Sequence, residues 1–308
     1  MKYIGVDIGG TKCAVVLGDE EGRVLKKEKF ATEDCAGTLA KIRAAVERMG
    51  ACDAIGISCG GPLDPQAGVI LSPPNLPGWD HVEIVKQFEE AYGVPVFLRN
   101  DADACALAEW KFGAGQGARD MIFLTFGTGF GAGLILGGRL YTGACGAAGE
   151  VGHIRLADHG PVGYGKSGSF EGFCSGGGLA QLGQIVACEQ QQMGHPVSFA
   201  DGEITAKTVA DAAKAGDPHA IEVYRRCGRM LGRGIALLID ILNPQRIVIG
   251  SIFQRAEGLL REEMEAVIRQ ETLAPSREAC QIVPAQLEDS IGDVAALCIA
   301  ACGLRGEI

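Results

Sequence analysis

Short apolar runs that flank glycine turns open the sequence and recur about a third of the way along it. Two apolar runs within residues 3–17 are joined by residues 9–12 (Gly-Gly-Thr-Lys), and two within residues 121–136 are joined by the glycine-rich residues 127–133. Each pattern predicts a hairpin. Glycine permits positive φ and close backbone approach, so such tips can offer N–H groups to an anion. Either copy alone would be an ordinary turn, but the repetition, with Asp7 before the first tip, favours two related halves that clamp a nucleotide.

Between and beyond these hairpins, apolar residues recur every three to four positions or form short unbroken runs. The first pattern predicts amphipathic helices and the second predicts buried strands. Their alternation in both halves indicates the α/β class, with two α/β domains and a cleft between them. The expected strands include residues 53–58, 94–98, 245–250 and 281–284. The expected helices comprise residues 37–49, 81–92, 102–112, 178–192, 205–215, 219–241, 255–269 and 291–302.

The best candidate for a domain boundary is the glycine-rich stretch of residues 113–117. It separates an N-terminal α/β domain of residues 1–117 from a C-terminal α/β domain of residues 118–289. The apolar closing segment, residues 290–308, is expected to form a helix that packs back on the N-terminal domain, because chain termini often lie close together.

Composition favours a small-molecule enzyme. The 308 residues carry a formal net charge of −10 without a Lys/Arg cluster, which argues against nucleic acid and anionic membranes as partners. The chain begins directly with a strand and has no apolar run of membrane-spanning length, so a cytoplasmic location is expected. The twelve cysteines form no C-x-x-C pair, and most are interpreted as small core residues rather than as disulfides or a four-cysteine zinc site.

Two charged residues flank the first glycine tip. Asp7 ends an apolar strand, where an unpaired carboxylate is costly to bury. Mg²⁺ or its water shell is one candidate partner for this carboxylate, and capping of the turn is an equally good alternative. Lys12 either meets a phosphate or faces solvent. The residues alone leave both questions open.

Asn100 and Asp101 lie where a buried strand gives way to a helix. In open α/β sheets, ligands bind at this edge. An aspartate here can accept the proton of a substrate hydroxyl that attacks a γ-phosphate. Asp and Asn are also good helix N-caps, and on these residues alone the capping role is favoured.

A third group comprises Glu150, His153 and Glu171 in a glycine-rich stretch. Two carboxylates and an imidazole are suited to hydrogen-bonding sugar hydroxyls, and sites of this kind discriminate strongly against analogues that lack a hydroxyl. Taken alone, His153 would more simply be a structural histidine.

Together these segments resemble the ROK family of sugar kinases (repressor, open reading frame, kinase), within the actin-like ATPase fold. The similarity extends over essentially the whole chain. The resemblance implies two actin-like (ribonuclease H-like) domains with a cleft between them, and ATP-dependent phosphorylation of a hexose. The matching stretches are Asp7–Lys12, Gly60–Pro62, Asn75–Trp79, Asn100–Ala102, Gly127–Gly131, Gly149–His153 and Asn243–Gly250.

The resemblance also implies a role for each matching residue. Asp101 would be the general base that deprotonates a sugar hydroxyl, expected at C6 of glucose. Mg²⁺ would bridge the phosphates near Asp7, and the protein would be a homodimer. Sugar would be bound by Gly61, Asn100, Asp101, Glu150, His153 and Glu171. ATP would be bound by Asp7, Gly9, Gly10, Thr11, Lys12, Gly127, Thr128, Gly129 and Gly250.

One departure from the family pattern concerns a structural zinc. Many members carry C-x-C-G-x-x-G-C-x-E after the histidine, but here the three cysteine positions are Val162, Tyr164 and Ser169. Valine cannot ligate zinc and one histidine cannot hold a structural site, so no zinc is expected. Packing of Tyr164, Phe170 and Phe173 is expected to hold the loop instead.

The identity of both substrates is left open by the sequence. Kinases for N-acetylmannosamine, fructose, mannose and allose share much of the sugar set, and residues 251–253 (Ser-Ile-Phe) depart from the usual glycines beside the adenosine. Sugar-responsive DNA-binding repressors of the family are disfavoured by the acidic charge and by Asp7 lying seven residues from the start. A catalytically weak sugar sensor is disfavoured by Asp101.

Overall fold

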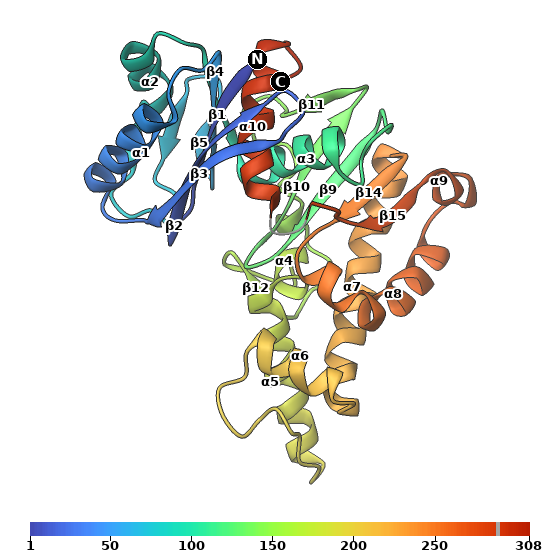
Figure 1. Ribbon diagram of the computed structural model, residues 1–308. Helices are drawn as coiled ribbons and strands as arrows, with labels where there is room; N and C mark the ends of the chain where they lie inside the picture. The colour runs from blue at the N-terminus through green and yellow to red at the C-terminus, as the bar shows by residue number, and fades with distance from the viewer. Residues whose placement is uncertain (288–289) are drawn as a thin grey trace. The chain divides into compact units, whose positions relative to one another are not determined.

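The computed structural model describes residues 1–287 and 290–308, which divide into two compact units (Figure 1). Unit 1 comprises Met1–Arg119, Gly133–Ala148 and Gln286–Ile308, and unit 2 comprises Asp120–Ala132 and Gly149–Ala285. This grouping differs from the expected division at residue 117 mainly in the segment 133–148, which belongs to unit 1. The expected boundary at residue 289 lies outside the described residues.

A five-stranded sheet forms the centre of unit 1, in the order β3-β2-β1-β4-β8. Its strands are β1 (Lys2–Ile8), β2 (Lys12–Asp19), β3 (Val24–Ala31), β4 (Ala54–Cys59) and β8 (Val96–Asn100). The first three strands are antiparallel neighbours, whereas β4 runs parallel to β1 and β8 runs parallel to β4. The expected opening hairpin and the two buried strands that follow it are therefore confirmed.

Helices cover both faces of this sheet (Figure 1). They are α1 (Cys35–Met49), α2 (Ile84–Tyr92), α3 (Asp101–Phe112) and α10 (Ile291–Leu304). The closing helix α10 is apolar nearly all round because it is buried against β1, β4 and α3. Gly56 on β4 leaves the room for it, since a methyl group there would lie 2.2 Å from the carbonyl oxygen of Ala296.

A small three-stranded sheet follows β4, with β5 (Leu63–Asp64), β6 (Val69–Leu71) and β7 (Asp80–Val82). The expected helix start at residue 81 is wrong, because His81 has a φ of +69° and β7 pairs with β6. Residues 72–79 between these strands are irregular, as expected from their prolines.

The second sheet repeats the plan of the first, in the order β11-β10-β9-β14-β15. It consists of β9 (Met121–Phe126), β10 (Phe130–Leu136), β11 (Arg139–Tyr141), β14 (Arg246–Ile249) and β15 (Gln281–Pro284). Here too a hairpin is followed by parallel strands, because β14 runs parallel to both β9 and β15. The repetition predicted from the two glycine-rich hairpins is confirmed.

Unit 2 is otherwise mostly helical. Its helices are η1 (Val151–His153, a 3₁₀ turn), α4 (Phe170–Phe173), α5 (Gly176–Gln192), α6 (Ala206–Lys214), α7 (Pro218–Leu242), α8 (Ile252–Glu271) and α9 (Ala274–Ala279). The longest, α7, begins with Asp217 as N-cap and Pro218 in the first turn, and it ends at Asn243 in the left-handed conformation. The short elements η1, α4 and α9 were not expected, because too few residues carry their periodicity.

The cysteines form no disulfide in the part of the chain that the structure describes. Cys13, Cys59, Cys227, Cys298 and Cys302 are buried, as expected. Cys188 on α5 is exposed and is one of the cysteines that are not core residues. Among the described helices, none combines the length and the hydrophobicity that crossing a membrane requires.

Candidate functional site

The strand register of unit 1 brings three segments to one edge of its sheet. Ile8 pairs with Cys59, and Cys59 pairs with Asn100, so the carboxyl ends of β1, β4 and β8 lie in one row. The residues that follow these strands are Gly9, the Gly60-Gly61 loop and Asp101. Candidates that are far apart in the sequence therefore share the edge at which α/β sheets bind ligands.

The first tip, residues 9–11, is a tight turn in which the N–H of Gly9 donates to the carbonyl of Lys12 at 3.2 Å. Gly10, Thr11 and Lys12 are exposed, so their polar groups are available to a ligand. A methyl group at Gly10 would lie only 2.5 Å from the carbonyl oxygen of Asn75. The tip thus packs closely on the 72–79 loop, and only glycine fits there.

Asp7 is a half-buried carboxylate beside the first tip. Burial raises its pKa to about 6, with further increases from the nearby Asp101 and Asp293 that Lys27 and Lys29 only partly offset. Within the described residues, no hydrogen bond to this carboxylate is found. A carboxylate whose charged form is disfavoured and that accepts no hydrogen bond can be stabilised by a cation. Mg²⁺ fits this position, because it is commonly held by one or two carboxylates together with substrate phosphates.

The sequence left open whether Asn100 and Asp101 cap the helix or bind a ligand, and in the structure the cap is formed by Asn100. The Asn100 side chain caps α3 by accepting the N–H of Asp103 at 2.7 Å. Asp101 is the first residue of the helix, and its Oδ1 accepts the N–H of Ala102 at 2.9 Å. Its side chain reaches solvent, yet the protein atoms crowded around the carboxylate desolvate it and raise its pKa. With the cap supplied by Asn100, the second carboxylate oxygen of Asp101 is available to a substrate.

The second tip, residues 127–129, lines a cavity of about 470 Å³ in unit 2. The N–H of Gly127 donates to the carbonyl of Gly129 at 3.1 Å, and its carbonyl accepts the N–H of Gly176 at 2.8 Å. Thr128 and Gly129 are exposed. The start of α5 therefore lies directly beside the tip, and helix N-termini favour anions.

Several lining residues of this cavity were not expected from the sequence. Lys207, Lys214 and Arg255 contribute cations, and Ser251 rather than Gly250 lines the wall. Gly250 lies just before it, where its N–H donates to the carbonyl of Leu124. The run Ser-Gly-Gly-Gly at 175–178 was a signal that could have been used, since a serine N-cap followed by glycines marks a helix start that a ligand can approach closely.

The third candidate group lies around η1 and α4 in unit 2. Glu150 is exposed at the start of η1, and its side chain makes no capping hydrogen bond. His153 ends η1, with its ring edge-on to that of Tyr164 at a centroid distance of 5.2 Å. Glu171 of α4 accepts the N–H of Phe130 at 3.0 Å. The polar side chains that the sequence assigned to a sugar thus lie on adjoining elements of one unit.

The loop between His153 and Glu171 is held by contacts other than those expected. Phe170 and Phe173 are buried as predicted, but Tyr164 is 68% exposed, so its expected role in core packing is wrong. Instead, Lys166 donates to the carbonyl of His153 at 2.6 Å. Ser169 caps α4 by accepting the N–H of Gly172 at 3.0 Å.

The three positions occupied by cysteines in many ROK members do not form a metal site here. Val162 offers no donor atom, Tyr164 is exposed, and the Ser169 hydroxyl is occupied as a helix cap. No group of three His, Cys, Asp or Glu side chains arranged to hold a metal is found in residues 1–287 and 290–308. This set of side chains does not fit zinc.

We expect zinc analysis of protein purified without added metal to give far less than one zinc per chain. Incubation with EDTA should leave the thermal unfolding midpoint unchanged, because hydrogen bonds from Lys166 and Ser169 hold the loop. A stoichiometric zinc content, or a loss of stability in EDTA, would contradict this expectation.

Residues 160–167 also contain the spacing Gly-x-x-x-x-Gly-Lys-Ser, which is typical of a phosphate-binding loop between a strand and a helix. The structure forms a hairpin there, from β12 (Val162–Gly163) and β13 (Lys166–Ser167). Lys166 is engaged by the carbonyl of His153, and no helix starts at this residue. The match is therefore not a nucleotide site.

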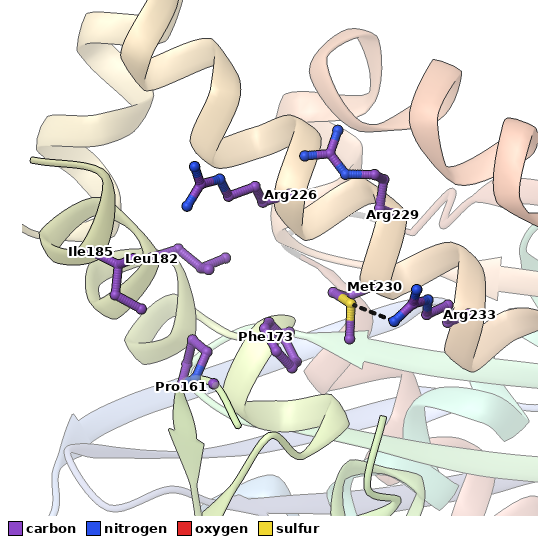
Figure 2. Close-up of a pocket in the computed structure, with 9 residues that line it drawn as sticks. Pro161, Phe173, Leu182, Ile185, Arg226, Arg229, Met230 and Arg233 are labelled. Atoms are coloured by element: carbon purple, nitrogen blue, oxygen red, sulfur yellow. Dashed lines mark hydrogen bonds between the residues drawn. The ribbon is translucent and has the colours of Figure 1, made fainter. Parts of the chain in front are cut away.

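A separate cavity of about 310 Å³ lies behind α4, between α5 and α7 (Figure 2). Leu182 of α5 and Phe173 of α4 form apolar walls, with arginines of α7 opposite. Arg226 is paired with Glu189 at 2.6 Å and Arg229 with Glu222 at 2.8 Å. The lining contains no carboxylate, so this cavity lacks a general base and does not fit phosphoryl transfer.

Comparisons with known proteins show the family and the relatives that this chain is similar to. The sequence model of the ROK family matches residues 3–301. A glucokinase from Streptomyces coelicolor is 33% identical over 303 residues, covering 95% of each chain. An N-acetylmannosamine kinase from Shigella boydii is 33% identical over 271 residues, covering 84% of this chain and 86% of the relative. A ROK glucokinase from Streptomyces griseus, solved with glucose and AMPPNP, superposes with a TM-score of 0.78 at 35% identity, covering 97% and 99% of the two chains.

Proposed function

We propose that this chain, which belongs to the ROK family and is a sugar kinase of the actin-like two-domain fold, transfers the γ-phosphoryl group of ATP to the 6-hydroxyl of glucose. The family and the kinase activity are established by the relatives; glucose, the position of transfer and the residue roles are the proposal. The observation that carries it is Asp101, an accessible carboxylate at the ligand-binding edge of the sheet whose capping task is performed by Asn100.

Asp101 is proposed as the general base. The sugar oxygen attacks the γ-phosphorus while its proton passes to the free carboxylate oxygen of Asp101. The bond between the γ-phosphorus and the bridging oxygen to the β-phosphate breaks, and ADP leaves with that oxygen. The desolvation that raises the pKa of Asp101 strengthens it as a base relative to an ordinary surface aspartate.

The two glycine tips are proposed to hold the phosphates of ATP. Backbone N–H groups of Gly10, Thr11, Thr128 and Gly129 supply donors at exposed positions, and the N-terminus of α5 adds the positive end of its dipole. The 470 Å³ cavity beside the second tip would take the adenosine, with Lys207 and Arg255 at its wall. Mg²⁺, when bound near Asp7, would neutralise phosphate charge.

Glu150, His153 and Glu171 are proposed to bind sugar hydroxyls, a role that the family resemblance implies for Asn100 and Gly61 as well. Carboxylates accept hydrogen bonds from hydroxyl groups, and an imidazole can donate or accept one. These side chains can therefore recognise hydroxyls at several positions of the sugar. We further propose a cytoplasmic homodimer that binds neither nucleic acid nor membranes, in keeping with the net charge of −10.

An ADP-release assay across hexoses and N-acetylhexosamines is expected to give the highest kcat/KM with glucose. N-acetylmannosamine is the strongest competing substrate to test, because a kinase for it is also 33% identical to this chain, over 271 residues against 303 for the glucokinase. Fructose, mannose and allose complete the panel. Preference for another sugar would replace glucose in the proposal, and ADP release that no sugar stimulates would refute the proposed kinase reaction.

A further inference from the structure

Glu171 lies where three glycine-containing segments of unit 2 meet. A methyl group at Gly129 of the second tip would lie 3.0 Å from its Oε2. Methyl groups at Gly152 of η1 and Gly163 of β12 would lie 3.3 Å and 2.8 Å from its Cβ. The partly buried side chain therefore lies close to backbone from the second tip, from η1 and from the loop between β12 and α4.

The two carboxylate oxygens of Glu171 differ in their hydrogen bonding. Oε2 accepts the N–H of Phe130, the residue directly after the second tip, at 3.0 Å. For Oε1, no hydrogen bond is found to any residue that the structure describes. Hydrogen bonds to a carboxylate are stronger than neutral ones, so this contact fixes Glu171 and Phe130 relative to each other.

The second tip depends on few such contacts. From outside the hairpin, Gly176 donates to the carbonyl of Gly127 and Glu171 accepts from Phe130. Within the hairpin, the N–H of Gly127 donates to the carbonyl of Gly129, and Thr125 Oγ1 accepts the N–H of Gly131. A shift of Glu171 would thus change the position of the backbone N–H groups at Thr128 and Gly129.

We propose that Glu171 couples sugar binding to nucleotide binding. A sugar hydroxyl that donates to Oε1 would fix the carboxylate, and Oε2 would then hold the second tip in the geometry that receives the phosphates of ATP. Glu171 is in this sense a positioning residue for the nucleotide as well as a ligand of the sugar. The inference rests on the proposed function, because it requires both ligands to bind.

Coupling of this kind is measured as a ratio of dissociation constants. Calorimetric titration with a non-hydrolysable ATP analogue and Mg²⁺ is expected to show about tenfold tighter binding at saturating sugar than without it. Reciprocity requires the analogue to tighten sugar binding by the same factor. In Glu171→Ala the ratio should fall to about one, even at sugar concentrations that restore saturation.

Two further variants separate coupling from simple loss of affinity. Glu150→Gln should weaken sugar binding yet retain the ratio, because no hydrogen bond from its side chain to the second tip is found in the described residues. Gly129→Ala places a methyl group 3.0 Å from Oε2. It should lower the ratio while sugar binding stays measurable, because Glu150 and His153 are untouched, and it covers the case in which Glu171→Ala fails to fold or to bind sugar.

A ratio near one in the wild-type protein would overturn the inference, as would a ratio that persists in both Glu171→Ala and Gly129→Ala. A wild-type protein that binds neither glucose nor any other sugar of the panel would instead refute the proposed function. The two failures are therefore distinguishable in the same titrations.

Discussion

Asp101→Asn is expected to lower kcat by about 10³-fold, within the range that general acid–base catalysis contributes. Asparagine has the same size and keeps an oxygen that can accept the N–H of Ala102, so the backbone at the start of α3 is preserved. It cannot take up the hydroxyl proton. The KM for sugar should change little, because the loss is confined to the step in which the proton moves.

The stability of this variant should remain at or slightly above that of the wild type. The helix cap belongs to Asn100, and desolvation disfavours the Asp101 charge that the substitution removes. Asp34→Asn is a matched control, since Asp34 caps α1 by accepting the N–H of Gly37 at 2.7 Å. It should retain kcat. Asp101→Asn with near wild-type kcat in the ADP-release assay would exclude Asp101 as the base.

Asp7→Asn is expected to stabilise the ligand-free protein at neutral pH while it impairs ATP-dependent activity. The Asp7 pKa is raised from its ordinary value of 3.8 to about 6, so the folded state disfavours the charged form. Below about pH 4 the carboxylate is protonated in both the folded and the unfolded state and costs nothing. The penalty grows as the pH rises to about 6 and is complete above it, with an upper limit of about 3 kcal/mol.

Urea unfolding of wild type and Asp7→Asn at several pH values tests this expectation. The difference in midpoint should be small near pH 3.5, increase towards pH 7 and then remain constant. Activity should fall at all pH values, because the variant lacks the carboxylate proposed to hold Mg²⁺. A stability difference that does not depend on pH, or a destabilised variant at pH 7.5, would contradict a raised pKa at Asp7.

Helices and strands were predictable from the sequence where a local pattern of apolar residues and glycines specifies them. The hairpins around residues 9–11 and 127–129 and the buried strand of residues 281–284 follow from apolar runs and glycine turns. Elements of two to six residues, such as β7 or α9, were missed, because their pairing partners rather than their own sequence stabilise them. His81 shows this directly, since its positive φ is imposed by the surrounding strand pair.

The sequence predicted which residues belong to the candidate site, but not which hydrogen bonds and contacts they make. Asp101 and Asn100 were both plausible caps, and only the backbone geometry at the end of β8 assigns the cap to Asn100. Tyr164 was expected to pack in the core, yet it is exposed and its ring forms a T-shaped pair with that of His153. The cations at 207, 214 and 255 carry no local pattern that marks them as neighbours of Thr128.

The sequence by itself therefore determined the doubled glycine hairpin, the α/β class, the resemblance to the ROK family and the loss of the cysteine ligands. These features depend on local backbone preference and on short motifs, which neighbouring residues specify. The tertiary structure decided that Asp7 is buried and lies near Asp101, which together raise the pKa of Asp7. It also decided that one carboxylate oxygen of Glu171 accepts the N–H of Phe130, directly after the second tip. Burial, charge proximity and shared hydrogen bonds arise between residues far apart in the chain, so they exist only once the chain has folded.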